Sequence, residues 1–177
     1  LTDGRGDVGS PEWSPDGRWI AFLSRGDIGD WLASVHVRVV SPSGGSVRDL
    51  TPRLEDLGRF TESAWAPDGR SLYFFLGQGT SLHICRVRLS GRMEQITQGD
   101  EVYGAMSLSR DGRRMAFLRQ DGASPPEVFA ALLRDFAPTQ LTRQNPQLRR
   151  HWLARKELVR WKSPDGTLVE GLLLKPA

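Results

Sequence analysis

The sequence predicts an all-β fold in which one unit of strand, turn and strand recurs. The turn has the pattern Ser-Pro-Asp-Gly-Arg, with variants, and occurs at residues 14–18, 66–70 and 109–113, each time followed by an apolar-rich segment. The residues just before the turns, at positions 13, 65 and 108, lie 52 and 43 residues apart. A period of about 40–50 residues is typical of the blades of a β-propeller. We therefore expect a partial β-propeller of about three four-stranded blades.

Each of these turns has the residue types that a β-hairpin requires. Pro15 and Pro67 preset φ for the second position of a type I turn, and the following glycine supplies the left-handed conformation that closes the hairpin. The third copy has Arg110 in place of proline. Asp16, Asp68 and Asp111 are interpreted as turn residues and not as calcium ligands, because single carboxylates in separate repeats give no run of alternating oxygen ligands.

A second strand pair follows each hairpin and completes a four-stranded unit. The units end in an apolar residue and a threonine, at Leu50-Thr51, Ile96-Thr97 and Leu141-Thr142. We expect the blades near residues 11–51, 61–98 and 104–143. Two polar stretches, residues 25–30 and 52–62, account for the longer first interval and are predicted to be loops.

The repeats also predict how the chain divides into domains. Closed propellers have about 4–8 blades, so three blades leave a ring open. The first residues, Leu1-Thr2-Asp3-Gly4, resemble the end of a blade, and we expect an earlier blade before them. Residues 1–150 are predicted to form the partial propeller. Residues 151–177 are predicted to be a linker and the first strands of another domain, because the strand after the Asp165-Gly166 turn continues into Lys175-Pro176 without further blade strands.

Composition is typical of a globular chain and argues against several classes of protein. The 177 residues are 38% hydrophobic and 25% charged, with a formal net charge of +3. Most arginines are scattered along strands, and the cluster at residues 149–156 is interpreted as an interdomain or solvent contact, so no nucleic-acid partner is expected. No run of 18 apolar residues occurs, which predicts no membrane span. The single cysteine, Cys85, is interpreted as a small core residue.

The sequence carries no recognisable catalytic or metal-binding motif. Its three histidines, His36, His83 and His151, lack the spacing of a zinc site. We interpret His36 and His83 as hydrogen-bonded strand residues. Neither a Gly-x-Ser-x-Gly nucleophile elbow nor a glycine-rich phosphate loop occurs. We therefore assign no catalytic, cofactor-binding or metal-binding residue to the chain and expect no cofactor.

The tail departs from the repeat. Residues 157–176 read E-L-V-R-W-K-S-P-D-G-T-L-V-E-G-L-L-L-K-P. Blades with Ser-Pro-Asp-Gly-Arg turns followed by this tail resemble the junction of propeller and catalytic domain in the prolyl oligopeptidase family of serine peptidases. The acylaminoacyl peptidase and dipeptidyl peptidase branches are the most similar, and the resemblance covers essentially the whole chain.

The resemblance implies an α/β-hydrolase domain after Pro176, with a catalytic Ser, Asp and His that all lie beyond Ala177. In such enzymes the propeller caps the active site and limits access to short or unfolded peptides. The chain is thus expected to be the non-catalytic gate of a cytoplasmic serine peptidase acting on short peptides, as an acylaminoacyl or dipeptidyl peptidase does. Its expected partners are the peptide substrate of the parent enzyme and the hydrolase domain, and a homo-oligomer is allowed.

Other functions stay open at this point. A propeller of the periplasmic Tol type shares the Ser-Pro-Asp-Gly-Arg turn and would bind proteins without catalysis, but it should close its ring and lack the V-E-G-L-L-L-K-P strand. A scaffold of WD repeats would carry Gly-His and Trp-Asp signatures, which are absent. A lyase or glycosidase on a propeller would need paired carboxylates that face the channel, whereas Asp and Glu fall mainly in turns and loops here.

Overall fold

The computed structural model describes residues 8–25, 34–54, 62–122, 124–144, 146–147 and 155–175. Within these ranges the chain forms fourteen β-strands and no α-helix, so the prediction of an all-β chain is confirmed. No helix in the described ranges is long and apolar enough to cross a membrane.

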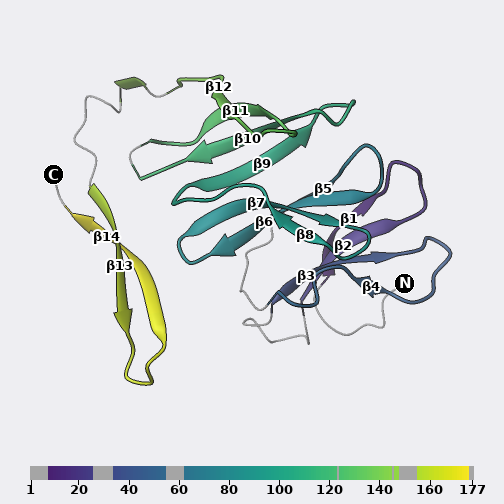
Figure 1. Cartoon of the computed structure of the whole chain (residues 1–177), viewed down its shortest axis with the longest axis horizontal. Helices are drawn as coiled ribbons and strands as arrows, with labels where there is room; N and C mark the ends of the chain where they lie inside the picture. The colour runs from purple at the N-terminus through teal and green to yellow at the C-terminus, as the bar shows by residue number, and fades with distance from the viewer. Residues whose placement is uncertain are drawn as a thin grey trace.

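The first twelve strands form three antiparallel meanders, which together are called the body (Figure 1). Their bounds are β1 Val8–Trp13, β2 Ile20–Arg25, β3 Val35–Val40 and β4 Arg48–Asp49 in the first meander; β5 Ser63–Trp65, β6 Ser71–Gln78, β7 Ser81–Arg88 and β8 Met93–Gln95 in the second; and β9 Val102–Leu108, β10 Arg114–Gln120, β11 Glu127–Leu132 and β12 Thr139–Gln140 in the third. β1 and β9 begin a few residues before the predicted starts at 11 and 104.

The first meander is a separate sheet, but the second and third join in one eight-stranded sheet. The junction is a single parallel pair, Leu82 of β7 with Val102 of β9, and the Leu82 N–H lies 3.4 Å from the Glu101 carbonyl oxygen. The short strand β8 pairs only with residues 85–87 of β7 and leaves the first half of that edge free, so β9 can pair there. The structure differs here from the expectation of three separate sheets.

The second meander lies between the other two and is buried on both faces. All residues of β6 from Ser71 to Leu76 are buried. Leu72, Phe74 and Leu76 pack against the first meander, whereas Tyr73 and Phe75 pack against the third. Each large apolar side chain buried in this way stabilises the fold by roughly 1.5–3 kcal/mol. Stacked sheets with a doubly covered middle layer are the packing expected of neighbouring propeller blades.

The Ser-Pro-Asp-Gly-Arg turns join the first and second strands of each meander, as predicted. In the first turn the Ser14 hydroxyl donates to Asp16 Oδ1 at 2.6 Å, and the Arg18 N–H donates to the same oxygen at 3.1 Å. The Trp19 N–H in turn donates to Ser14 Oγ at 2.9 Å. Gly17 closes the turn at a φ of 68°, in the left-handed region. Asp16 therefore acts as a turn residue.

Successive turns also lie beside one another along one rim of the body. The Asp16 carboxyl lies 3.5 Å from the position that a Cβ on Gly69 would take, and Pro67 Cδ lies 3.2 Å from the corresponding position on Gly112. Gly69 and Gly112 have φ values of 64° and 67°. The glycines thus provide both the backbone conformation and the space that neighbouring turns need.

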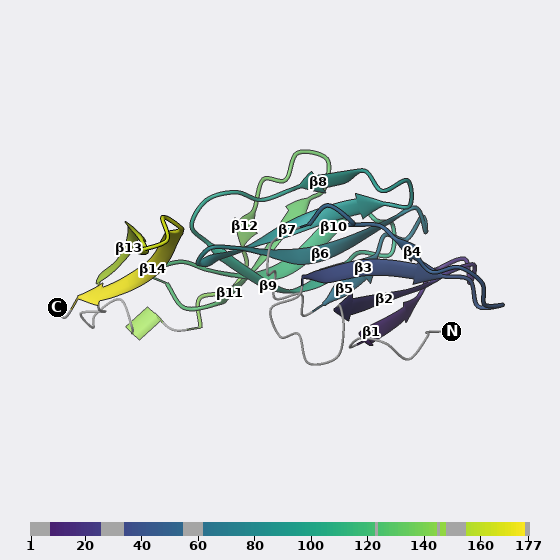
Figure 2. The same cartoon turned by 90° about the horizontal axis from the view of Figure 1, so that it is seen from below.

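The tail forms a two-stranded antiparallel hairpin, called the hairpin below, from β13 Arg155–Lys162 and β14 Leu168–Lys175. It pairs with no strand of the body. Figures 1 and 2 show it at one end of the molecule, apart from the three meanders. The tail therefore extends none of the three meanders.

Several predictions fall wholly or largely outside the described residues. These are the blade ending at Leu1 to Gly4, most of the predicted loops at 25–30 and 52–62, the basic cluster at 149–156 and His151.

Replacing any of the three turn glycines by alanine should lower the free energy of unfolding by about 1 kcal/mol or more, because a Cβ is disfavoured at positive φ. Gly112→Ala should be the most damaging, since its Cβ would also press on Pro67. Urea denaturation of the three variants measures this. Gly9→Ala is the control, because a Cβ there meets nothing within 4 Å, and equal stability of all four variants would contradict the turn assignment.

The Asp165 carboxyl in the turn of the hairpin should titrate at unusually low pH. The Ser163 hydroxyl and the Thr167 N–H bind the Asp165 carboxylate and lower its pKa from 3.8 to about 2. A carboxyl with a lowered pKa stabilises the folded turn above pH 3.8 and loses that contribution as pH falls through about 2. Ser163→Ala should move the NMR titration midpoint of Asp165 upward, towards 3.8, and an unmoved midpoint would contradict this account.

Candidate functional site

Each meander ends in the same hydrogen-bonded closure, made by its final threonine. The threonine hydroxyl accepts the backbone N–H of a residue in the third strand, and the residue before the threonine donates its own N–H to a carbonyl of that strand. The pairs are Val37 N–H with Thr51 at 3.0 Å, Ile84 N–H with Thr97 at 2.9 Å and Val128 N–H with Thr142 at 2.9 Å. This threonine closure explains the apolar-Thr endings that recur in the sequence.

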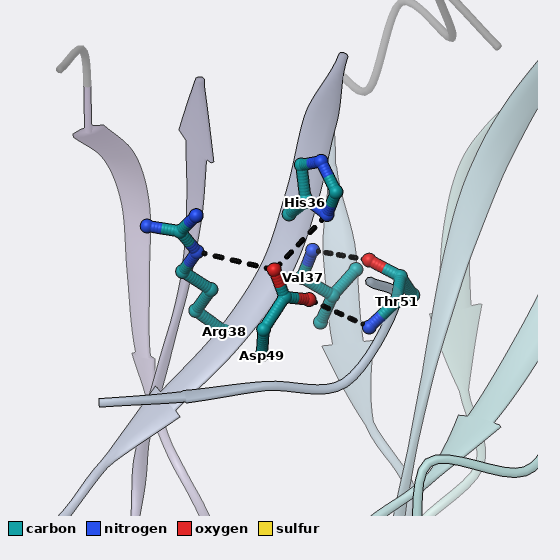
Figure 3. A network of polar contacts seen from close by, with 5 residues as sticks. All are labelled: His36, Val37, Arg38, Asp49 and Thr51. Carbon is teal, nitrogen blue, oxygen red and sulfur yellow. Dashed lines mark hydrogen bonds and ion pairs between the residues drawn. The ribbon is translucent and has the colours of Figure 1, made fainter. Parts of the chain in front are cut away.

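The closure of the first meander carries a cluster of polar side chains (Figure 3). Asp49 Oδ1 accepts the Thr51 N–H at 2.8 Å, while Asp49 Oδ2 lies 3.1 Å from His36 Nδ1 and 3.5 Å from Arg38 Nε. The approach of His36 is close, but its geometry is not that of an aligned hydrogen bond.

A histidine beside a carboxylate suggests general-base chemistry, but this cluster lacks a usable nucleophile. The neighbouring hydroxyl is that of Thr51, which is buried and already accepts the Val37 N–H. Both carboxylate oxygens of Asp49 are already in use. One accepts the backbone N–H of Thr51, after β4, and the other lies beside the side chains of His36 and Arg38 on β3. We conclude that His36, Arg38 and Asp49 hold the end of the first meander together. His36 lies in a strand as expected, but its Nδ1 approaches Asp49 without forming the expected hydrogen bond.

His36 directly precedes Val37, whose N–H the threonine accepts. The residue at this position in the other two meanders is also polar and supports the closure. His83 is buried, its Nδ1 lies 3.4 Å from Thr97 Oγ1, and burial lowers its pKa, which favours the neutral ring. Glu127 accepts the Thr142 hydroxyl and, at 2.8 Å, the Gln144 N–H. Both residues therefore serve the local structure, as predicted for His83.

The described residues offer no reactive thiol and no metal centre. Cys85 is fully buried in the core between the first and second meanders, as predicted, and burial raises its pKa to about 12, so the thiol stays protonated at neutral pH. Across the ranges that the structure describes, no group of three or more His, Cys, Asp or Glu side chains could hold a metal ion.

One carboxyl that the sequence reasoning missed lies at the junction of the first two meanders. Glu12 is half-buried on β1, burial raises its pKa, and its backbone carbonyl accepts the Trp65 indole N–H at 3.2 Å. The equivalent positions in the other meanders, opposite Tyr73 and Ala116, are Ala64 and Ser107. A carboxylate where the other copies have small residues is the signal that could have drawn attention to Glu12.

The contact between the hairpin and the body is the second place where polar groups converge. Glu170 of β14 accepts the Thr80 backbone N–H at 3.2 Å and lies 3.5 Å from the Thr80 hydroxyl. Its other carboxylate oxygen accepts the Arg160 Nε–H at 2.8 Å. Arg160 and Thr80 together hold the pKa of Glu170 below its usual value. A charged side chain therefore fixes the hairpin on the turn between β6 and β7.

No protein-family model matches the chain. Over 105 residues, 58% of its length, the chain is 36% identical to the uncharacterized peptidase YuxL of Bacillus subtilis. Over 136 residues, 76% of its length, it is 25% identical to dipeptidyl-peptidase 5 of Porphyromonas gingivalis. Both relatives are peptidases, which supports the resemblance to the propeller region of the prolyl oligopeptidase family of peptidases. The chain spans 14% and 19% of the length of these two relatives.

Solved structures share the fold of the chain. The acylaminoacyl peptidase of Pyrococcus horikoshii superposes with a TM-score of 0.68 at 20% identity, over 91% of this chain and 24% of that one. A putative TolB from Agrobacterium tumefaciens superposes with a TM-score of 0.63 at 21% identity, over 98% of this chain and 61% of that one. The chain thus has a fold that an acylaminoacyl peptidase and a putative TolB share.

Removing the Thr97 hydroxyl should destabilise the body. In Thr97→Val the buried Ile84 N–H loses its partner, which should cost about 1–3 kcal/mol of unfolding free energy. Thr97→Ser keeps the hydroxyl and is the control. Thr142→Val should cost less, because that closure is only half-buried and water can replace the hydroxyl. Chemical denaturation measures the unfolding free energies of the three variants. An unchanged unfolding free energy in Thr97→Val would refute the structural role of the closure.

Proposed function

We propose that this chain is the non-catalytic gating propeller of a serine peptidase that hydrolyses short peptides, in the manner of an acylaminoacyl or dipeptidyl peptidase. The observation that carries the proposal is the placement of the hairpin. Its sequence has the junction motif of the family, it stays out of the body's sheets, and it contacts the turn between β6 and β7. That turn lies at the opposite end of β6 from the Ser-Pro-Asp-Gly-Arg turns.

This placement supports a particular orientation of the gate. Lys156 of β13 lies beside Gly122, which follows β10, so the hairpin contacts the same rim of the second and third meanders. A hydrolase domain that continues from β14 would cover this rim, and the Ser-Pro-Asp-Gly-Arg turns would face away from it. The propeller would then stand between the solvent on that side and the catalytic serine, and it would limit which peptides reach the serine.

The exposed apolar residues of the hairpin fit burial by such a domain. Trp161 on one face of the hairpin and Leu172 and Leu174 on the other are 50–58% exposed, which is unusual for large apolar side chains on one small sheet. The proposed partners are accordingly the α/β-hydrolase domain and the peptide substrate of the parent enzyme. The three meanders are proposed to be three of the blades, and the parent is proposed to be cytoplasmic and able to form a homo-oligomer.

A Tol-type binding propeller without catalysis is the second candidate. It is favoured by the superposition on the putative TolB, of which the chain covers 61%. Such a protein would use the body as a platform for other proteins. The separate hairpin argues against it, because a binding propeller would use its last strands to complete a blade.

Activity-based labelling tests the proposal. The 177-residue chain should neither react with a fluorophosphonate serine probe nor cleave acylaminoacyl or dipeptidyl chromogenic substrates, because no nucleophile elbow is present. The full-length parent should do both. A parent from which the body has been deleted should still be labelled and should accept longer or folded polypeptides.

Two outcomes would contradict the gating function. Labelling of the 177-residue chain itself would place the nucleophile inside it. A parent that binds no probe and cleaves no peptide, but captures folded proteins through the body, would favour the binding propeller.

A further inference from the structure

A carboxylate of the hairpin makes a hydrogen bond to the body. Glu170 is far from Thr80 in sequence, yet its Oε1 accepts the Thr80 N–H and lies within reach of the Thr80 hydroxyl. Its Oε2 is held by Arg160 on the neighbouring strand. Arg160 thereby fixes the side-chain direction of Glu170, so that the other carboxylate oxygen, Oε1, points to the body.

The turn between β6 and β7 is shaped to receive this carboxylate. Gly79 has a φ of 56°, and a Cβ at this position would collide with Glu170 Oε1. The glycine thus supplies the left-handed conformation of the turn and also the space through which the carboxylate reaches the Thr80 N–H. Exposed backbone N–H groups beside a left-handed residue form a concave site suited to an anion.

The face of the hairpin that carries Glu170 is the face directed at the body. In the register of β13 and β14, Glu170 is opposite Arg160, and Lys156 belongs to the same face by strand alternation. Lys156 Cβ lies 3.6 Å from the position that a Cβ on Gly122 would take. The opposite face carries a different ion pair, Glu157 with Lys175 at 2.6 Å.

The described contact between hairpin and body is polar and narrow. The large apolar side chains of the hairpin remain exposed and contribute little to it; they are Trp161, Leu168, Leu172, Leu173 and Leu174, with exposed fractions of 43–63%. The meanders, in contrast, join through a continuous apolar core. A polar contact of a few atoms can open without exposing apolar surface, whereas the core cannot.

We propose that Glu170 is a releasable latch, which holds the hairpin against the Gly79–Thr80 turn in one orientation and lets it pivot when the carboxylate leaves that turn. The latch itself depends only on contacts within this chain. Its effect on access to an active site rests on the proposed gating function. Release would allow the domain that begins with the hairpin to swing away from the rim of the body and admit peptide.

Distance measurements on the 177-residue chain test the latch directly. Nitroxide labels are attached through Leu168→Cys on the hairpin and Ser90→Cys on the body, both exposed positions, while native Cys85 is fully buried and protected from labelling. Electron paramagnetic resonance then gives the distribution of label distances. The variants are Glu170→Ala, which removes the latch, and Gly79→Ala, which obstructs its seat. Glu157→Ala removes the matched carboxylate on the opposite face and is the control.

The expected result is one narrow distance population in the parent chain and in Glu157→Ala, and a broad or shifted population in Glu170→Ala and Gly79→Ala. Hydrogen exchange of the Thr80 amide should also accelerate about tenfold in Glu170→Ala, as expected for the loss of a charge-assisted hydrogen bond. The urea midpoint of the body should not change in this variant, which separates release from unfolding.

The proposal is overturned if Glu170→Ala and Glu157→Ala give the same distances and the same Thr80 exchange rate. It is also overturned if the parent chain already shows a broad distribution that Glu170→Ala does not widen. Because these readouts need no peptidase activity, a failed latch and a failed gating function give different results: the first changes no distances, and the second shows in the labelling of the parent enzyme.

Discussion

The body depends on the burial of both faces of the second meander. Alternate residues of β6 point to opposite cores, with Leu72 and Phe74 on one side and Tyr73 and Phe75 on the other, all almost inaccessible to solvent. A sheet that is apolar on both faces is stable only between two neighbours. This constraint sets the order and spacing of the meanders and so places their turns on one rim and their threonine closures near the other.

Around this core, the repeated turns and threonine closures keep their structure although some of their residues differ between the meanders. The second turn has Ala66 in place of serine and the third has Arg110 in place of proline, yet both keep the Asp–backbone hydrogen bond and the left-handed glycine. The closures keep the threonine while the supporting residue changes from His83 in the second meander to Glu127 in the third. Because packing against neighbours already holds the strands together, one local hydrogen bond can be lost without losing the hairpin.

Sequence reasoning captured what local chemistry determines and missed what depends on neighbouring repeats. The turns and the strand ending at Thr51 follow from residue types that act over a few positions, so their spacing was enough to predict them. The pairing of Leu82 with Val102 depends on how short β8 is, and the contact of Glu170 with Thr80 depends on how the tail folds back. Neither has a periodic pattern in the chain, which is why both appeared only in the structure.

The junction between the meanders and the contact between the hairpin and the body differ in how firmly they hold their parts together. Trp65 is buried and donates to the Glu12 carbonyl, so the first and second meanders share an apolar core reinforced by a directional hydrogen bond. Trp13, its counterpart in the first repeat, is 58% exposed because the described residues provide no preceding meander to receive it. The tryptophan at this position thus serves to join one repeat to the one before it. Among the described residues no tryptophan joins the hairpin to the body, and Glu170 makes the hydrogen bond between them, so we expect the body to move as one unit and the hairpin to move against it.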